Sequence, residues 1–344
     1  MNNRLRNVNQ QAPKNITIND IADDLGVSKT TISRAISGKG RIGNAMREKV
    51  LSYIEVHGYR PNLIAKSLAV SKTFNIAVAL PTDTEVNEIP FFQTCLQSIT
   101  NTVTGRDYDV VISVMSSQDI TGLKRLILNQ KVDGVILTRL LTDDRAVAFL
   151  QEEDIPFVVI GTSSDPSIIQ IDSDHLSGCR EVTAHVLENS RGNVILLAGD
   201  GEHHVNKDRY AGFASALADA GMKEEDVSVI WNLKGNEQIE KIMGEVMKKK
   251  PDCLVCMDDV ICGFVLAWLQ KNRFEVPRDV KIASFHDSAA MEHHNPPVTA
   301  LHIHVQELGA SAGTILLDAI EGKDVPYKNR VGYEFIIRGS TRAH

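Results

Sequence analysis

The 344-residue sequence has few of the features that mark exported, membrane-spanning or disulfide-stabilised proteins. Its first stretch, MNNRLRNVNQQAPKN, is polar and has no apolar run, which argues against a secretory signal or a membrane anchor. The five cysteines are an odd number, and free thiols in a reducing compartment fit this better than a disulfide framework. We therefore expect a cytoplasmic globular protein with no membrane contact and a disordered arm over residues 1–15.

Motifs for catalysis and metal binding are also missing. Cys253 and Cys256 have the spacing of a zinc or redox pair, but no second pair follows them, which favours simple packing of small side chains. We find no nucleophile elbow, phosphate-binding loop or paired-carboxylate motif, and an enzyme is the alternative that these absences argue against. The sequence predicts no cofactor, no catalytic residue and no metal site, although three pairs of histidines invite one: His203 with His204, His293 with His294, and His302 with His304.

Charge is distributed unevenly along the chain. The overall net charge is −7, which taken alone argues against nucleic acid. Residues 1–72, however, contain 12 Lys and Arg against 5 Asp and Glu, whereas the remaining residues contain 25 against 39. A small basic region therefore precedes a large acidic one, and only the first is suited to a polyanionic partner.

Residues 16–60 predict a three-helix, helix-turn-helix domain. In ITINDIADDLGVSKTTISRAISG, Thr17 and Asp20 suit a capping box, Gly26 ends the first helix, and Ser28 caps the second. A third helix is expected at about 44–57. In a helix-turn-helix the second helix enters the DNA major groove, where Lys and Arg can reach guanine edges. A helical hairpin with a solvated basic face is the alternative. The candidate DNA contacts here are Thr17, Ser28, Lys29, Thr30, Thr31, Ser33 and Arg34.

The segments VSKTTISRAISGKGRI, REKV and GYRPNLIAKSLA resemble the DNA-binding head of the lactose-repressor and purine-repressor family (LacI/GalR). The resemblance extends over nearly the whole chain. It implies that residues 61–72 form a hinge helix that orders on operator DNA, pairs with its copy in a homodimer and inserts a leucine into the minor groove. Leu68 falls at the position of that leucine, and Asn62 and Lys66 are further candidate contacts. Lys66 stands where the family usually has arginine.

After Lys72 the pattern changes to short apolar runs separated by helical stretches. Runs such as NIAVAL, DGVIL, NVILLAG and DCLVCM predict buried parallel strands, eight or more in all. The expected fold is therefore α/β: an all-α helix-turn-helix head followed by a two-lobed, doubly wound body over 73–344. Ligands in such folds bind beyond the carboxyl ends of the strands, so two facing lobes predict a cleft.

The family resemblance implies a body like that of periplasmic sugar-binding proteins, with three chain crossings and a small-molecule effector in the cleft. KDRYAGF matches the family motif whose arginine binds the effector, which implies that Arg209 is an effector contact. MDDVICG matches a second family motif and implies the same for Asp258. SFHD at 284–287 departs from the family pattern, because His286 replaces an acidic residue and casts doubt on a plain monosaccharide effector. A cleft histidine without ligand contact is the alternative. The candidate effector contacts are Phe91, Phe92, Thr138, Arg139, Arg209, Trp231, Asp258 and His286.

These features predict a transcriptional regulator, most readily a repressor, that binds a pseudo-palindromic operator in double-stranded DNA as a dimer. Its effector would be carbohydrate-like. The alternative is a sugar receptor without regulatory DNA binding, but such a protein needs an export signal and has no use for a basic head. The sequence does not identify the effector or the operator.

Overall fold

The computed structural model describes residues 16–38, 40–59, 67, 71–82, 90–142, 144–190 and 192–342. The chain forms two compact units, Met1–Lys72 and Thr73–His344. The expected arm at 1–15 and three candidate DNA contacts, Asn62, Lys66 and Leu68, lie outside the described residues, as does most of the expected hinge helix at 61–72.

Residues 16–59 of the first unit, where the structure describes them, form three helices, and the ends of these helices follow from local sequence. The Thr17 N–H donates to Asp20 Oδ2 at 2.8 Å, and the Asp20 N–H donates to Thr17 Oγ1 at 3.4 Å, so the expected capping box is present. Gly26 ends the first helix at a φ of +65°, a conformation that glycine adopts without steric cost. Ser28 Oγ accepts from the Thr31 N–H and caps the second helix. The helices are α1 (Ile18–Leu25), α2 (Lys29–Ser37) and α3 (Asn44–His57).

A small apolar core joins these helices. Ile21, Ile32 and Val50, one from each helix, are completely buried and pack in one cluster. Each helix therefore turns one apolar face inward and keeps its polar face in solvent. The three-helix head expected from the sequence is confirmed.

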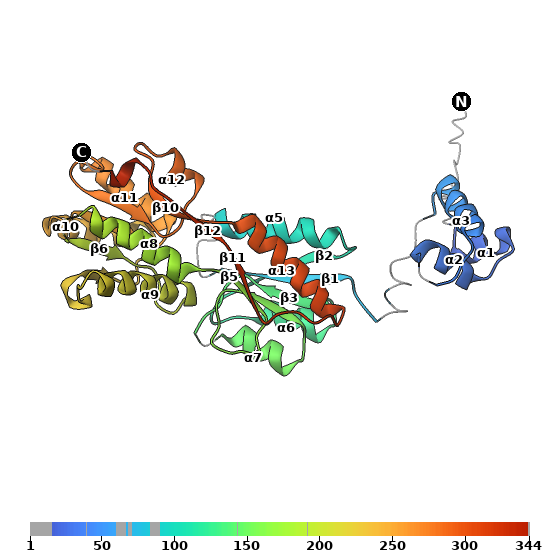
Figure 1. Cartoon of the computed structure of the whole chain (residues 1–344). Helices are drawn as coiled ribbons and strands as arrows, with labels where there is room; N and C mark the ends of the chain where they lie inside the picture. The colour runs from blue at the N-terminus through green and yellow to red at the C-terminus, as the bar shows by residue number, and fades with distance from the viewer. Residues whose placement is uncertain are drawn as a thin grey trace, which may run out of the picture. The chain divides into compact units, whose positions relative to one another are not determined.

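The second unit has two lobes, each built on a six-stranded sheet (Figure 1). The first sheet has the order β11-β5-β4-β3-β1-β2, and all of its neighbouring strands are parallel. Its strands are β1 (Asn75–Pro81), β2 (Asp109–Met115), β3 (Gly134–Leu137), β4 (Phe157–Ile160), β5 (Gln170–Ser173) and β11 (Lys328–Val331).

Helices cover both faces of this sheet. Successive side chains of β1 alternate between two separate cores, with Ile76 and Val78 in one and Ala77 and Ala79 in the other. Burial on both faces explains why the strand reads as a continuous apolar run. The first core lies under α5 (Pro90–Thr104) and α13 (Val305–Ile320), which run side by side in Figure 1, and the second under α6 (Thr121–Leu128) and α7 (Arg145–Glu152).

The second sheet repeats the arrangement of the first, with the order β12-β10-β9-β8-β6-β7. Its strands are β6 (Val194–Leu197), β7 (Ser228–Ile230), β8 (Cys253–Cys256), β9 (Lys281–Ser284), β10 (Thr299–Ile303) and β12 (Tyr333–Ile336). Helices α8 and α9 pack against each other, as do α10 and α11. The helices of this lobe are α8 (His175–Glu188), α9 (His204–Asp219), α10 (Gly235–Lys248), α11 (Asp259–Lys271) and the short α12 (Ala289–His293).

The chain passes between the lobes three times, from β5 to α8, from β10 to α13 and from β11 to β12, as the family resemblance implied. β11 is parallel to β5, but β12 is antiparallel to β10. Only Gly332 separates β11 from β12, so the chain continues in one direction through the junction. This segment therefore runs toward the boundary between the lobes as β11 of the first sheet and away from that boundary as β12 of the second.

Two strands, β5 and β11, were not expected from the sequence. Their sequences, QIDS and KNRV, contain no apolar run, so hydrophobic pattern does not reveal them. All four residues of β5 are nevertheless buried. Their polar groups find partners: the Ser163 N–H donates to Gln170 Oε1 at 2.6 Å, and the Thr162 hydroxyl donates to Asp172 Oδ2 at 3.1 Å.

Candidate functional site

A cavity of about 480 Å³ lies between the two lobes, where the carboxyl ends of their parallel strands meet. Side chains that follow β3, β8 and β9 reach it directly. From the first lobe it is lined by residues that include Phe91, Thr138, Arg139 and Asp172, and from the second by residues that include Asp200, Arg209, Asp258, Asp259 and His286.

Seven of the eight residues expected in this cleft line the cavity: Phe91, Phe92, Thr138, Arg139, Arg209, Asp258 and His286. The eighth, Trp231, does not line it, and its contact with an effector stays a prediction. It follows the edge strand β7 and packs against Tyr210, with ring centroids 5.2 Å apart. A position just after a strand is therefore not enough to predict that a residue lines the cavity when that strand lies at the edge of the sheet.

The two phenylalanines differ in what they offer a ligand. Phe92 is 7% exposed and belongs to the apolar core of the first lobe. Phe91 is half-buried and lies edge-on to His286, with ring centroids 6.1 Å apart. Phe91 is therefore the better placed of the two to contact a ligand face.

Two buried arginines reach the cavity from opposite lobes. Arg139 is 7% exposed and Arg209 is 8% exposed. One terminal nitrogen of Arg209 donates to the Met257 carbonyl at 2.9 Å, while Nε has no hydrogen-bond partner among the described residues. A buried guanidinium donor without a partner is costly, so Arg209 is prepared to donate to a bound molecule.

Asp258 and Thr138 have structural roles in addition to lining the cavity. Asp258 caps α11 by accepting from the Ile261 N–H at 2.8 Å, and burial raises the pKa of its carboxyl group. The Thr138 hydroxyl donates to the Ala79 carbonyl at 2.7 Å. The Thr138 hydroxyl proton is thus already committed, whereas the second carboxyl oxygen of Asp258 remains a possible acceptor.

Two buried carboxylate–imidazole pairs also line the cavity, and sequence reasoning missed three of their four members. Asp172 lies 3.2 Å from His175 Nε2, and Asp259 lies 2.9 Å from His286 Nδ1. Burial raises the pKa of each carboxyl, but the charge and hydrogen bond of its histidine outweigh that effect and lower the pKa overall. The doublet at Asp258 and Asp259 was the available signal for one pair. The other is hidden because β5 has no apolar pattern.

A short bridge joins the lobes beside the cavity. Leu141 pairs with His203 as an isolated antiparallel β-bridge, and the Thr142 N–H donates to the Glu202 carbonyl at 3.2 Å. Lys207 Nζ donates to the Thr142 hydroxyl at 2.7 Å. These contacts connect the loop after β3 with the start of α9, and both segments also supply cavity residues.

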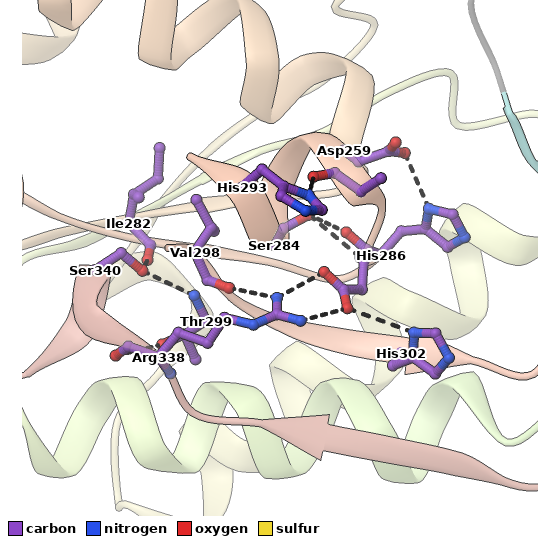
Figure 2. Close-up of polar contacts among 12 residues, drawn as sticks. Asp259, Ile282, Ser284, His286, His293, Val298, Thr299, His302, Arg338 and Ser340 are labelled. Carbon is purple, nitrogen blue, oxygen red and sulfur yellow. Dashed lines mark hydrogen bonds and ion pairs between the residues drawn. The ribbon is translucent and has the colours of Figure 1, made fainter. Parts of the chain in front are cut away.

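The loop that carries His286 is held by a polar network of the second lobe. Figure 2 shows Arg338 at its centre, near Val298 and His302. Its two terminal nitrogens donate to the two carboxyl oxygens of Asp287 at 2.7 and 2.8 Å, and one also donates to the Val298 carbonyl at 2.8 Å. His302 Nδ1 lies 3.4 Å from Asp287 Oδ2. A bidentate, largely buried pair of this kind fixes the loop beside the cavity.

The candidate DNA contacts of the head lie on α2 and at its start. Lys29, Thr30, Ser33 and Arg34 are exposed, and Thr31 is half-buried. The side chains of Thr17 and Ser28 are exposed as well, but both are engaged in helix caps. The uncommitted donors on this surface are thus concentrated at Lys29 and Arg34, and the DNA role of each residue stays a prediction.

The described residues include free thiols but no metal-binding cluster. No group of three or more His, Cys, Asp or Glu side chains there could hold a metal ion. All five cysteines are buried free thiols, and burial raises the pKa of Cys95 to about 12. Within the same residues, no helix has the length and apolarity to cross a bilayer.

Models of two protein families match separate parts of the chain. Residues 17–62 match the bacterial regulatory proteins of the lacI family, and residues 183–341 match the periplasmic binding protein-like domain. The chain is also 26% identical to the HTH-type transcriptional regulator MalR of Staphylococcus xylosus over 317 residues, which cover 90% of this chain and 93% of MalR. The chain therefore combines a DNA-binding domain of the lacI family of bacterial regulatory proteins with a periplasmic binding protein-like domain, as the sequence resemblance indicated. It is a DNA-binding regulator with a small-molecule effector, and the relatives it matches are transcriptional regulators.

Solved structures of LacI-family proteins agree with this fold. The complex of the regulator CelR with cellobiose has a TM-score of 0.70 at 25% identity and covers 94% of this chain and 99% of CelR. The lac repressor dimer bound to operator has a TM-score of 0.80 at 21% identity and covers 96% of this chain and 100% of the repressor, a likeness that concerns the fold alone.

Proposed function

We propose that this LacI-family protein is a dimeric cytoplasmic repressor that reads a pseudo-palindromic operator and is controlled by a carbohydrate-like effector in the inter-lobe cavity. Residues 16–60 would read the operator, 61–72 would form the hinge, and 73–344 would bind the effector and the second copy. The observation that carries the proposal is Arg209, a buried cation with an unpaired donor in a cavity shared by both lobes.

The exposed face of α2 supports specific DNA reading. The side chains of Lys29 and Arg34 are exposed and take no part in a helix cap, and either can donate to guanine O6 and N7 in the major groove. Substituting either by alanine is expected to cost about 1–3 kcal/mol on the specific site and less on random DNA. Equal losses on both kinds of DNA would instead make these side chains phosphate contacts.

An apolar strand edge supports the homodimer. Ile112 and Val114 point to one face of the edge strand β2 and are 53% and 60% exposed, and Leu128 of the neighbouring α6 is 62% exposed. Uncovered edge strands with exposed apolar side chains are prone to pair with another chain. A second copy of this chain would bury them.

The cavity supports an effector with both polar and flat surfaces. Phe91 offers an aromatic edge, Arg209 a donor, and Asp258 an acceptor, which together suit a ring that bears hydroxyl groups. CelR, a relative of similar fold, was solved with cellobiose. The carbohydrate class is therefore the first to be tested.

Two measurements test the proposal. Thermal unfolding of the full chain is followed with cellobiose, maltose, ribose, glucose 6-phosphate and adenosine, because a ligand that binds only the folded state raises stability. Selection of bound fragments from genomic DNA then yields the operator, which should be pseudo-palindromic. A ligand-induced shift without sequence-specific DNA binding would favour a receptor. Turnover of a bound compound would favour an enzyme.

A further inference from the structure

His286 lies at a boundary between the protein and the cavity. It follows β9, its imidazole is 9% exposed, and it lies between the Asp259 carboxylate and the Phe91 ring. Figure 2 shows the contact with Asp259, in which Nδ1 is 2.9 Å from Oδ1. The opposite ring nitrogen, Nε2, has no hydrogen-bond partner among the described residues.

The chemistry of this pair decides which nitrogen carries the proton. An ionised carboxylate only accepts hydrogen bonds, and the lowered pKa of Asp259 keeps it ionised at neutral pH. His286 must therefore donate through Nδ1–H. In the neutral imidazole Nε2 is then a bare acceptor, because each neutral ring has one donor and one acceptor nitrogen.

The backbone around His286 restricts movement of the ring. The Ser284 hydroxyl donates to the His286 carbonyl at 2.6 Å, and the Asp287 N–H donates to the Leu301 carbonyl at 2.8 Å. Arg338 holds the Asp287 carboxylate by both oxygens. The loop is thus fixed on both sides of His286, and the hydrogen bond to Asp259 fixes the orientation of the imidazole ring.

We propose that Asp259 is a positioning residue that presents His286 Nε2 to the cavity as a hydrogen-bond acceptor, so that the effector places a hydroxyl or N–H donor there. The inference rests on the proposed function, because it assumes that this cavity binds the effector. The Asp259–His286 pair would then determine specificity. It would disfavour effectors whose group next to Nε2 can only accept a hydrogen bond, such as a carboxylate or a phosphate.

The proposal requires the neutral form of the ring. A neutral imidazole with its proton on Nδ1 accepts at Nε2, whereas an imidazolium donates from both nitrogens and offers no acceptor to a donor group of the effector. The carboxyl groups that face the imidazole are those of Asp258, the N-cap of α11, and Asp259, its first residue, while Phe91 of α5 adds no charge. Arg209 of α9 and Arg139 of the first lobe line the same cavity.

The first test reads the tautomer directly. The full chain is labelled with ¹⁵N-histidine, the His286 signals are assigned by their loss in His286→Gln, and long-range ¹H–¹⁵N spectra are recorded at pH 8. We expect a protonated Nδ1 and an unprotonated Nε2 in the wild type, and loss of that preference in Asp259→Ala. A wild-type His286 that carries its proton on Nε2, or a tautomer unaffected by Asp259→Ala, would overturn the proposal.

The second test reads the effector. The thermal-unfolding series with cellobiose, maltose, ribose, glucose 6-phosphate and adenosine is repeated at pH 8 with Asp259→Asn, and with Asp219→Asn, an exposed aspartate on the same lobe, as the matched control. For each compound that stabilises the wild type, affinity should fall about three- to tenfold in Asp259→Asn and stay unchanged in the control.

The outcomes separate the two claims. Binding that is insensitive to Asp259→Asn would overturn the role of the pair and leave the proposed function intact. If none of the five compounds stabilises the wild type, the proposed carbohydrate effector fails and this inference fails with it.

Discussion

The two lobes share one topology and differ in what their strands carry to the cavity. Their sheets have matching strand orders, so β3 of the first lobe corresponds to β8 of the second. β3 leads into Thr138 and Arg139, whereas β8 leads into Asp258 and Asp259. The topology thus determines where side chains can meet a ligand, and the chemistry at equivalent positions is free to differ.

The lobes also differ at their edges. The edge strand of the first sheet, β2, has two strongly exposed apolar side chains, whereas the three residues of β7, at the matching edge of the second, are all half-buried. An equivalent position in the fold therefore has different uses. We infer that the first lobe's edge supports association and the second lobe's does not.

The largest expected effect is on assembly. Replacing Ile112 and Val114 together by lysine should convert the dimer to a monomer, since like charges would face each other along the edge. Light scattering after size-exclusion chromatography measures the mass. Tyr327→Lys, at a side chain 54% exposed away from that edge, serves as the control and should stay dimeric. A dimeric double variant would place the second copy elsewhere.

The next largest effect is on stability, when an ion pair in one lobe is broken and the loss is compared with that of an ion pair in the other lobe. Arg338 and Asp287 of the second lobe are 13% and 4% exposed, while Arg106 and Asp318 of the first are 28% and 26% exposed. Arg338→Met should lower the free energy of unfolding by about 3–5 kcal/mol, because it removes the bidentate partner of the buried Asp287 carboxylate and leaves only the more distant His302. Arg106→Met should cost about 0–1 kcal/mol. Urea unfolding measures both, and equal losses would contradict the difference in burial.

Arg209→Ala is expected to weaken effector binding by about 1.5–3 kcal/mol, the usual range for a hydrogen bond from a charged donor. Operator affinity without effector should be unchanged. Calorimetry with the most stabilising compound of the thermal series measures the loss, and Arg180→Ala, at an exposed salt bridge on the same lobe, is the control. If circular dichroism shows that Arg209→Ala does not fold, Arg209 is instead a structural residue.

A smaller effect concerns acid stability in the first lobe. The pKa of Asp172 is lowered, so its contribution to stability is present above the unfolded value of about 4 and is lost as pH falls through the lower folded value. Asp172→Asn should cost about 1 kcal/mol at pH 7 and make stability fall less steeply below pH 4. Urea unfolding from pH 2 to 7 measures this, and parallel curves for variant and wild type would rule out the linkage.

The smallest effect is expected at the bridge between the lobes. The hydrogen bond from Lys207 to Thr142 is exposed, so Lys207→Met and Thr142→Val should show a coupling of about 0.5 kcal/mol in a double-mutant cycle. Amide exchange at Thr142 and His204 should become faster in either variant, because their N–H groups donate across the lobes. Unchanged exchange would mean that the backbone bridge does not depend on this contact.

Local signals predicted the head better than the cavity. The ends of α1 and α2 could be assigned from Thr17, Gly26 and Ser28 because caps act within a few residues of the chain. Most cavity residues were named through the family resemblance, and Trp231, which was expected among them, follows an edge strand and does not line the cavity. Asp172 was missed because β5 has no apolar pattern. The doublet at Asp258 and Asp259 marked a site, but nothing in the sequence says that Asp259 will touch His286, 27 residues away.

The sequence alone determined the alternation of buried strands and helices, the three-helix head and its basic surface, because apolar periodicity, caps and charge are local properties. Only the tertiary structure decided that polar β5 is a buried strand, that β12 turns antiparallel to β10, and that Asp259 meets His286. These features depend on which strands become neighbours. That choice is made by packing and chain connectivity over long sequence distances, where no local pattern records it.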